Sequence, residues 1–178
     1  MSSSNWEITK NEKVSLGRFT INYDHLLIEG LESVYSYVEI NNGVCILPLL
    51  NDKIITIKQY RYPLKKWEYE LPAGMIDKGE KPLESAKREL KEETGYKAKD
   101  YKLLGHFYPS AGSTDEKVYL YLAKNLVKRK DKLDIAEDIE VNKFNLDQIK
   151  EMIVNNKFTH GSGIAAFSKY VFSITKSK

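Results

Sequence analysis

The sequence lacks several features that would place it in a specialised class of protein. It has one cysteine, Cys45, inside the apolar run Val44–Leu50, so no disulfide can form within the chain and Cys45 is expected to be a small buried residue. No apolar run approaches the roughly 20 residues of a membrane-spanning helix. The first residues also lack the basic and then apolar pattern of a secretory signal. We therefore expect a cytoplasmic protein with no membrane partner.

An excess of charge of one sign is also missing. The chain has 28 Lys and Arg residues against 25 Asp and Glu residues, a net charge of +3, and the two signs are interspersed. A nucleic-acid-binding domain more often carries a basic stripe and a higher net charge. The nearest such feature, Lys128–Lys132, is more typical of a solvated loop, so we expect no nucleic-acid partner.

The 178 residues are enough for one domain with a proper core and too few for two large domains. Between Lys13 and Ile40 short stretches alternate between apolar and polar residues, and Phe19, Ile21 and Tyr23 share one face. This period predicts half-buried antiparallel strands. We expect residues 1–40 to form a small strand subdomain and residues 41–178 to form the main domain.

The main domain mixes strands and helices. The apolar run Gly43–Leu50, a turn at Asn51–Asp52 and the following strand predict a hairpin in a central sheet. Turn residues and periodicity then predict further elements: strands at Lys53–Tyr60, Trp67–Leu71, Lys102–Tyr108, Val118–Ala123 and Ile139–Phe144, and helices beginning at Pro82, Asp147 and Ser162.

The helix that begins at Pro82 and ends at Gly95 carries an unusual set of carboxylates. With Leu83 at zero on a helical wheel, Ala86 and Leu90 share its face, and Glu92, Glu89 and Glu93 lie at about 180°, 240° and 280°. Like charges four residues apart, and a negative charge in the last turn, both disfavour a helix. The glutamates are therefore either half of a Mg²⁺–pyrophosphate site or a solvated face paired with neighbouring basic residues.

The residues around this helix decide between these alternatives. The stretch reads Gly74-x5-Glu80-x7-Arg88-Glu89-Leu90-x-Glu92-Glu93-x-Gly95-Tyr96. The seven positions other than Leu90 and Tyr96 would match by chance on the order of once in 10⁸ windows. The pattern resembles the Nudix box, and it departs from that box only in Tyr96, where the Nudix hydrolase family has an aliphatic residue.

The resemblance implies a fold and roles for single residues. The fold class is α+β: the family's α/β/α sandwich with a mixed central sheet, preceded here by the antiparallel strands. Glu89 and Glu93, with the carbonyl of Ala73, are implied as ligands of Mg²⁺, or of Mn²⁺ in its place. Glu92 is implied to assist catalysis, and Arg88 to hold the box carboxylates in orientation.

Segments outside the box resemble the ADP-ribose pyrophosphatase branch of the family. These are Gln59–Pro63, Glu70–Gly74, and the segment from Pro109, 14 residues after Gly95, through Gly112 to an Asp-Glu pair. This last segment has Ser-Ala-Gly where Ser-Pro-Gly is more usual. The branch implies hydrolysis of ADP-ribose to AMP and ribose 5-phosphate. A nucleotide-sugar pyrophosphatase, for example for GDP-mannose, and a non-catalytic ADP-ribose sensor remain as alternatives.

Substrate-binding residues are expected from the same segments. Arg61 could clamp the diphosphate or form a surface ion pair. Tyr62 and Trp67 could stack on the base or belong to the core. Glu70 and Gly112 complete the expected substrate site.

Two further polar positions carry open alternatives. Glu137 could be the general base that activates water or an ordinary loop acid, with Asp138 and Glu140 as substitutes. His160 could contact the substrate or be a surface residue that leads into a helix. The branch also implies a homodimer built by the N-terminal strands.

Overall fold

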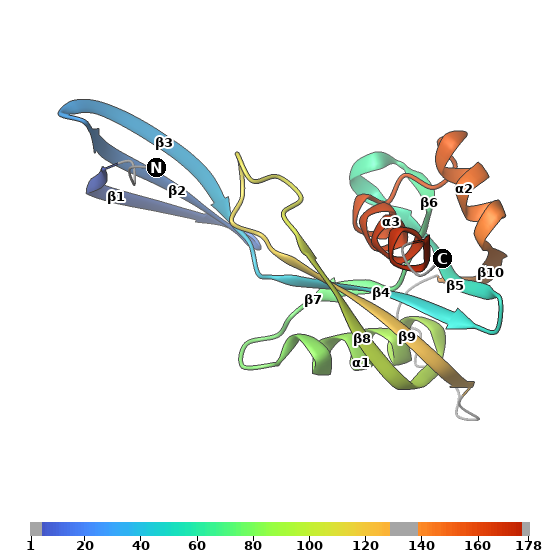
Figure 1. Cartoon of the computed structure of the whole chain (residues 1–178). Coiled ribbons are helices and arrows are strands. Elements are labelled where there is room, and N and C mark those ends of the chain that lie inside the picture. Colours follow the sequence, from blue (N-terminus) through green and yellow to red (C-terminus); the bar gives the residue numbers. More distant parts are fainter. Residues whose placement is uncertain (1–4, 129–138, 176–178) are drawn as a thin grey trace. The chain divides into compact units, whose positions relative to one another are not determined.

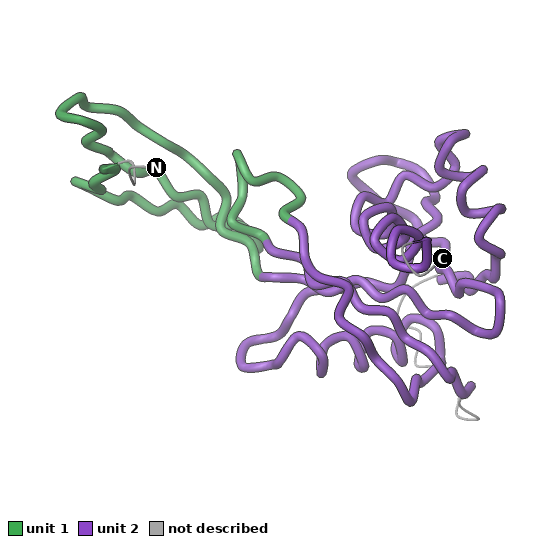
Figure 2. Tube along the Cα trace, in the orientation of Figure 1, with its two compact units in different colours: residues 1–41, 108–116 green, residues 42–107, 117–178 purple. Residues whose placement is uncertain are grey.

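The computed structural model describes residues 5–128 and 139–175. The chain divides into two compact units (Figure 2): unit 1 comprises Met1–Asn41 and Tyr108–Glu116, and unit 2 comprises Asn42–Phe107 and Lys117–Lys178. No helix within these described residues is long and apolar enough to cross a membrane.

Unit 1 is a three-stranded antiparallel sheet in the order β1 (Trp6–Leu16), β2 (Phe19–Ile28) and β3 (Leu31–Glu39). Glu29 and Gly30, with φ of 51° and 85°, form the two-residue turn between β2 and β3, as expected for a tight hairpin. The strands begin at Trp6 and not at Lys13 as predicted. The early residues are mostly polar, and they become a strand because they pair with β2.

The face of β2 that was expected to be buried is exposed, and the opposite face is buried. Ile21 and Tyr23 are 44% and 41% exposed, whereas the intervening Asn22 is 1% exposed. Asn22 Nδ2 donates to Glu39 Oε2 at 3.2 Å, and Asn11 Nδ2 donates to Asp24. The alternation itself is as predicted, but in this chain the polar face of β2 is the buried one.

Unit 2 is built on a seven-stranded sheet. Its strands are β4 (Gly43–Leu50), β5 (Lys53–Arg61), β6 (Lys66–Glu70), β7 (Ala73–Met75), β8 (Tyr96–Phe107), β9 (Val118–Lys128) and β10 (Glu140–Asn145). The main path runs β10-β5-β4-β9-β8, with β6 beside β5 and β7 beside β4. The β4–β9 pair is parallel and the other pairs are antiparallel, so the sheet is mixed. The predicted hairpin is confirmed, with Leu49 opposite Ile54.

Helices cover both faces of this sheet (Figure 1), with α1 (Pro82–Thr94) on one side and α2 (Leu146–Val154) and α3 (Gly161–Thr175) on the other. Strand β4 is apolar throughout because both of its faces are covered. Its alternate side chains Val44 and Ile46 pack with α1, while Cys45 and Leu47 pack in the cluster that contains α2 and α3 residues. The expected α/β/α sandwich is confirmed.

The ends of α1 are as predicted, but its buried face is centred differently. Gly95 ends the helix with φ of 71°, and its N–H donates to the carbonyl of Lys91. Ala86 and Leu90 are fully buried, whereas Leu83, expected beside them, is 37% exposed. The buried residues of α1 are Ser85, Ala86, Glu89, Leu90 and Thr94. Glu89 therefore lies inside the buried stripe and does not merely border it.

Strands β8 and β9 are longer than the predicted Lys102–Tyr108 and Val118–Ala123. Tyr96 pairs with Lys128 at the far end of their hairpin. The added residues include many lysines, whose weak strand preference hides the extension in the sequence. Pairing between the two strands determines their length.

Candidate active site

Gly74 allows α1 to approach β7 closely. A Cβ atom at Gly74 would lie 2.0 Å from Glu89 Oε1, a distance that real Cβ atoms do not show. Residues of α1 also bind the next carbonyl: Arg88 Nη2 and Ser85 Oγ donate to the Met75 oxygen at 3.0 and 3.4 Å. The box glycine is thus needed because a carboxylate occupies the space of its side chain.

Arg88 connects the acidic residues of the box. Its Nε and Nη2 donate to the two carboxylate oxygens of Glu80 at 3.0 and 2.9 Å. Its Nη1 donates to Glu89 Oε1 at 2.6 Å and to Glu92 Oε2 at 3.3 Å. The hydrogen bonds from Arg88 to Glu80 lower the pKa of Glu80 to about 2. Arg88 is therefore placed to orient the carboxylates of Glu80, Glu89 and Glu92.

The carboxyl groups of Glu93 and Glu89 are largely buried and therefore poorly solvated. The Ala73 N–H donates to Glu93 Oε2 at 2.9 Å. Burial raises the pKa of Glu93 to about 8, and it also raises the pKa of Glu89 against the opposing effect of Arg88. Ionised carboxylates in such a place require a compensating charge. The Glu92 side chain is 51% exposed and lies on the open side of the helix.

These oxygens suit a hard divalent cation. Within residues 5–128 and 139–175, no group of three or more His, Cys, Asp or Glu side chains forms a metal-binding cluster. Mg²⁺, however, is usually held by one or two carboxylates together with substrate phosphates and water. Glu89, Glu93 and the neighbouring Ala73 backbone meet that requirement, and a cation there would compensate the two buried carboxylates.

Arg61 forms an ion pair whose acidic end is buried. Its Nε and Nη2 donate to the two oxygens of Glu70 at 2.6 and 2.5 Å, and Gln59 Nε2 donates to Glu70 Oε2 at 3.1 Å. Arg61 is 41% exposed at its side chain and Glu70 only 4%. The guanidinium is thus oriented by a buried carboxylate, while the Arg61 side chain as a whole is partly exposed.

The aromatic residues near Arg61 lie on the surface. Tyr62, in the short helix η1 (Tyr62–Leu64), is 73% exposed, and Trp67 on β6 is 47% exposed. Tyr60 contacts Trp67 edge to face, with ring centroids 6.0 Å apart. The alternative that Tyr62 and Trp67 belong to the core is therefore wrong.

The other expected site residues are distributed differently. Glu137 and Asp138 lie outside the described residues. Glu140, at the start of β10, has its Oε2 4.0 Å from Lys58 Nζ. Gly112 belongs to unit 1, where its carbonyl accepts a hydrogen bond from the Tyr35 hydroxyl at 2.8 Å.

His160 is largely buried, so the alternative that it is a surface residue is wrong. Its side chain is 15% exposed, its Nδ1 accepts from the Leu71 N–H at 3.3 Å, and its Nε2 lies 3.9 Å from Glu70 Oε2. Burial lowers the pKa of His160. The partners precede it by about 90 residues in the chain, so no local pattern marks the contact.

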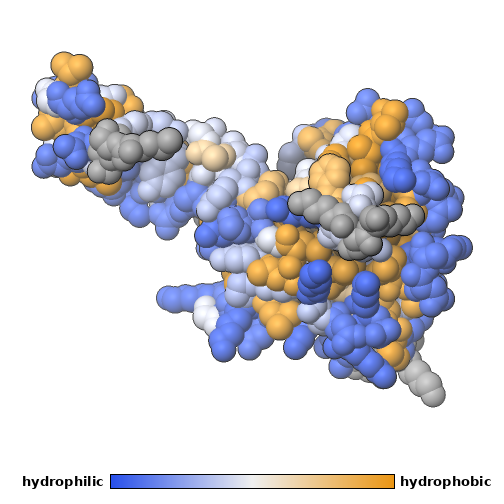
Figure 3. Space-filling model, in the orientation of Figure 1, coloured by the Kyte–Doolittle hydropathy of each residue, from blue (hydrophilic) through white to orange (hydrophobic). Residues whose placement is uncertain are grey.

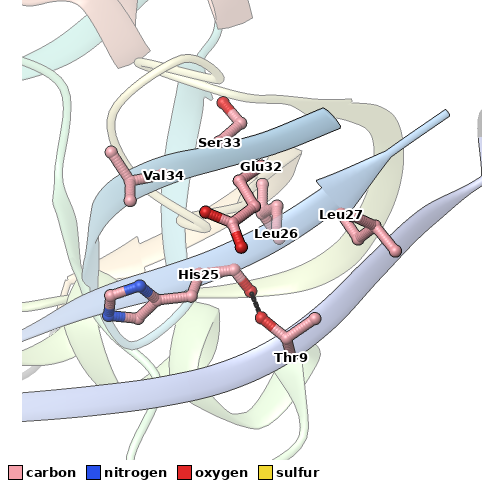
Figure 4. Close-up of a pocket in the computed structure, with 7 residues that line it drawn as sticks. All are labelled: Thr9, His25, Leu26, Leu27, Glu32, Ser33 and Val34. Atoms are coloured by element: carbon pink, nitrogen blue, oxygen red, sulfur yellow. Dashed lines mark hydrogen bonds between the residues drawn. The ribbon is translucent and has the colours of Figure 1, made fainter. Parts of the chain in front are cut away.

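A pocket in unit 1 is lined by residues outside the box. It lies among the three strands and is lined by Thr9, His25, Leu26, Leu27, Glu32, Ser33 and Val34 (Figure 4). The Thr9 hydroxyl donates to the His25 carbonyl at 3.1 Å, and His25 Nε2 lies 2.9 Å from Glu12 Oε1. None of its lining residues was expected in the site.

Comparison with known proteins agrees with this geometry. Residues 40–165 match the model of the NUDIX domain, so the chain belongs to the Nudix family. A Bacillus methanolicus protein named methanol dehydrogenase activator is 33% identical over 162 residues, covering 88% of each chain. The ADP-ribose pyrophosphatase of Bacillus subtilis (strain 168) is 38% identical over 130 residues, covering 71% of this chain and 70% of its own.

A solved structure extends the likeness to nearly the whole chain. The crystal structure of an ADP compounds hydrolase superposes with a TM-score of 0.88 at 25% identity, covering 99% of this chain and 98% of the other. The sequence-based assignment to the Nudix family and its fold is confirmed.

Proposed function

We propose that the protein hydrolyses the pyrophosphate of ADP-ribose to AMP and ribose 5-phosphate with Mg²⁺. The observation that carries this proposal is the pair of buried carboxylates, Glu89 and Glu93, against the backbone of Ala73 and Gly74. Similarity to proteins named ADP-ribose pyrophosphatase and ADP compounds hydrolase supports the choice of substrate.

Glu89, Glu93 and the Ala73 carbonyl would hold the divalent cations. When bound, such cations neutralise phosphate charge and make a bound water more acidic. Arg88 keeps Glu89 in place through its 2.6 Å bond while it is itself anchored on Glu80. Glu92, on the open side of α1, is free to face solvent and assist from there.

Arg61 is the residue we assign to the diphosphate. Its orientation is set by Glu70, so the entropy cost of ordering it is met before the substrate arrives. The exposed rings of Tyr62 and Trp67 are available for stacking on a base. Gly112 stays a predicted contact to the substrate.

Hydrolysis needs a base that takes a proton from water as it adds to one phosphorus and the P–O bond to the bridging oxygen breaks. Glu137 stays the predicted base, with Asp138 and Glu140 as substitutes. Because Glu140 lies beside Lys58, its carboxylate is paired in the structure, which favours Glu137 and Asp138 as the base.

Two alternatives use the same fold. A nucleotide-sugar pyrophosphatase would differ in the base and sugar that it reads, and a sensor would bind ADP-ribose without cutting it. The sensor is disfavoured because Glu89, Glu92 and Glu93 are all present, with Glu89 and Glu92 bonded to Arg88 and Glu93 bonded to the Ala73 N–H.

We also propose that unit 1 forms a homodimer through the apolar face of its sheet. Along this face Val14 pairs with Ile21 and Ile21 with Val38, and Phe19 and Tyr23 lie on the same side of β2. Val14 and Ile21 are 64% and 44% exposed, and apolar side chains are visible on unit 1 in Figure 3. A contiguous apolar patch on a sheet is typical of a protein interface.

We further propose a cytoplasmic location, because the unpaired Cys45 fits a reducing compartment.

The test is hydrolysis by the purified protein of ADP-ribose, GDP-mannose, diadenosine phosphates, NADH and nucleoside triphosphates, with Mg²⁺, with Mn²⁺ and with EDTA. We expect the highest kcat/KM for ADP-ribose, with AMP as product and no turnover in EDTA. Better turnover of GDP-mannose would overturn the substrate while leaving the chemistry. Tight binding of ADP-ribose without AMP release would establish the sensor.

A further inference from the structure

The segment before α3, residues 158–160, contacts β6 and the residue that follows it. Phe158 is 1% exposed, the Thr159 hydroxyl donates to Glu68, and His160 accepts from the Leu71 N–H at 3.3 Å. Leu71 follows β6 directly and precedes Ala73 by two residues. The contact therefore acts on the backbone that leads into the box.

The same imidazole faces a buried carboxylate. Since Nδ1 accepts the Leu71 N–H, a neutral ring carries its proton on Nε2. Nε2 lies 3.9 Å from Glu70 Oε2, a close polar contact rather than a hydrogen bond. The same oxygen accepts hydrogen bonds from Gln59 Nε2 and Arg61 Nη2. His160 thus adds a polar N–H to the surroundings of the group that orients Arg61.

Close packing keeps the ring in this position. A Cβ atom at Gly163 would lie 2.9 Å from His160 Nδ1 and 2.8 Å from the Phe158 ring. Gly163, in the first turn of α3, therefore leaves the room that both rings occupy. The imidazole is held as part of the frame around Leu71 and Glu70.

The frame borders the carboxylates of the box. Glu93 bonds to the Ala73 N–H, and both Glu70 and Arg61 exert electrostatic effects on Glu93. A shift of the Leu71–Ala73 backbone would move the Ala73 N–H that bonds to Glu93. A shift of Glu70 would break the hydrogen bonds that orient Arg61. The Leu71–Ala73 backbone and the Glu70–Arg61 pair therefore both depend on His160, which lies about 90 residues further along the chain.

We infer that His160 is a positioning residue for pyrophosphate hydrolysis, holding the Leu71–Ala73 backbone through Nδ1 and the Glu70–Arg61 pair through Nε2. This inference rests on the proposed function. It makes His160 responsible for two separable properties: cation affinity, through the backbone beside Glu93, and substrate affinity, through Arg61.

The test compares His160→Ala, His160→Asn and the neighbouring Thr159→Val. Asparagine Oδ1 can occupy the place of Nδ1 and accept the Leu71 N–H, but nothing replaces Nε2. Thr159→Val removes the adjacent contact to Glu68 and spares both His160 contacts, so it controls for general loosening of the segment. Mn²⁺ affinity is measured by electron paramagnetic resonance without substrate, KM and kcat with ADP-ribose, and folding by thermal denaturation.

For His160→Ala we expect about tenfold weaker Mn²⁺ binding and about tenfold higher KM, the size expected for one buried donor left unpaired. His160→Asn should restore Mn²⁺ affinity to within about twofold and leave KM raised. Thr159→Val should change neither, even if it melts earlier.

Wild-type Mn²⁺ affinity and KM in a folded His160→Ala protein would overturn the inference. So would failure of both His160 variants to fold while Thr159→Val folds, because the role would then be in folding alone. If the wild type does not cleave ADP-ribose, the proposed function fails, but the Mn²⁺ measurement still decides the role of His160.

Discussion

The two units of the molecule handle their apolar side chains in opposite ways. In unit 2 Ile46, Ile54 and Leu120 are completely buried, whereas in the described part of unit 1 Leu26 is the only buried apolar side chain. Unit 1 instead buries polar groups such as Asn22 and leaves an apolar face uncovered. An uncovered apolar face on a small sheet is typical of a surface that binds a partner. Unit 2 contains its own core, and the uncovered face of unit 1 is the observation behind the proposed homodimer.

The largest expected effect comes from removing one buried charge in unit 2. Glu93→Gln keeps the size and helix propensity of the residue and removes a cation ligand, so kcat should fall about 1000-fold with the fold intact. Steady-state kinetics and circular dichroism check this. The matched control is Glu92→Gln on the exposed side of the same helix, which should lose less than Glu93→Gln. Full activity of Glu93→Gln with unchanged Mg²⁺ dependence would remove Glu93 from the site.

Gly74→Ala should have the next largest effect. The added Cβ would meet Glu89 Oε1 at 2.0 Å, so the carboxylate must move, and a displacement of about 1 Å at a catalytic group can cost about 100-fold in kcat. Gly161→Ala, where a Cβ meets nothing within 4 Å, is the control and should keep its activity. Equal kinetics for the two variants would show that the close approach of Glu89 to Gly74 is not needed.

The comparison of the units is tested directly by a charge on the apolar face of unit 1. Ile21→Arg should weaken the proposed homodimer at least about tenfold, because an arginine would have to be desolvated in the interface. The control is Val154→Arg, at a position in unit 2 that is 78% exposed. Light scattering at micromolar concentration measures the change. A wild-type monomer, or a dimer unaffected by Ile21→Arg, would contradict the assigned interface.

The smallest expected effect is a higher stability of Glu93→Gln than of the wild type at high pH. Burial raises the pKa of Glu93 from the ordinary 4.5 to about 8, so between these values the unfolded chain releases a proton that the folded protein retains. Stability without metal therefore falls as the pH rises through this window. In EDTA at pH 8.5, Glu93→Gln should melt about 5 °C above the wild type, with little difference near pH 5. Scanning calorimetry with Glu92→Gln as reference decides this, and a lower Tm for Glu93→Gln would refute it.

The sequence by itself determined the elements that rest on local spacing. The limits of α1, the placing of Glu89 and Glu93 on one side of it, and the alternation in β2 follow from residues a few positions apart. Such patterns reflect the repeat of a helix or strand, which is a local property. The helix that carries the box could be predicted for this reason, and the apolar run of β4 predicted a strand of the central sheet, which the structure covers on both faces.

The tertiary structure alone decided which faces are covered and which distant groups meet. Periodicity groups the residues of β2 into two faces but does not say which one is buried, and the structure buries Asn22 and exposes Ile21. Leu83 shares a helix face with buried residues but is itself exposed. His160 reaches Leu71 across 89 positions. Contacts over such separations depend on how sheets and helices pack, and a sequence read locally contains no period that records them.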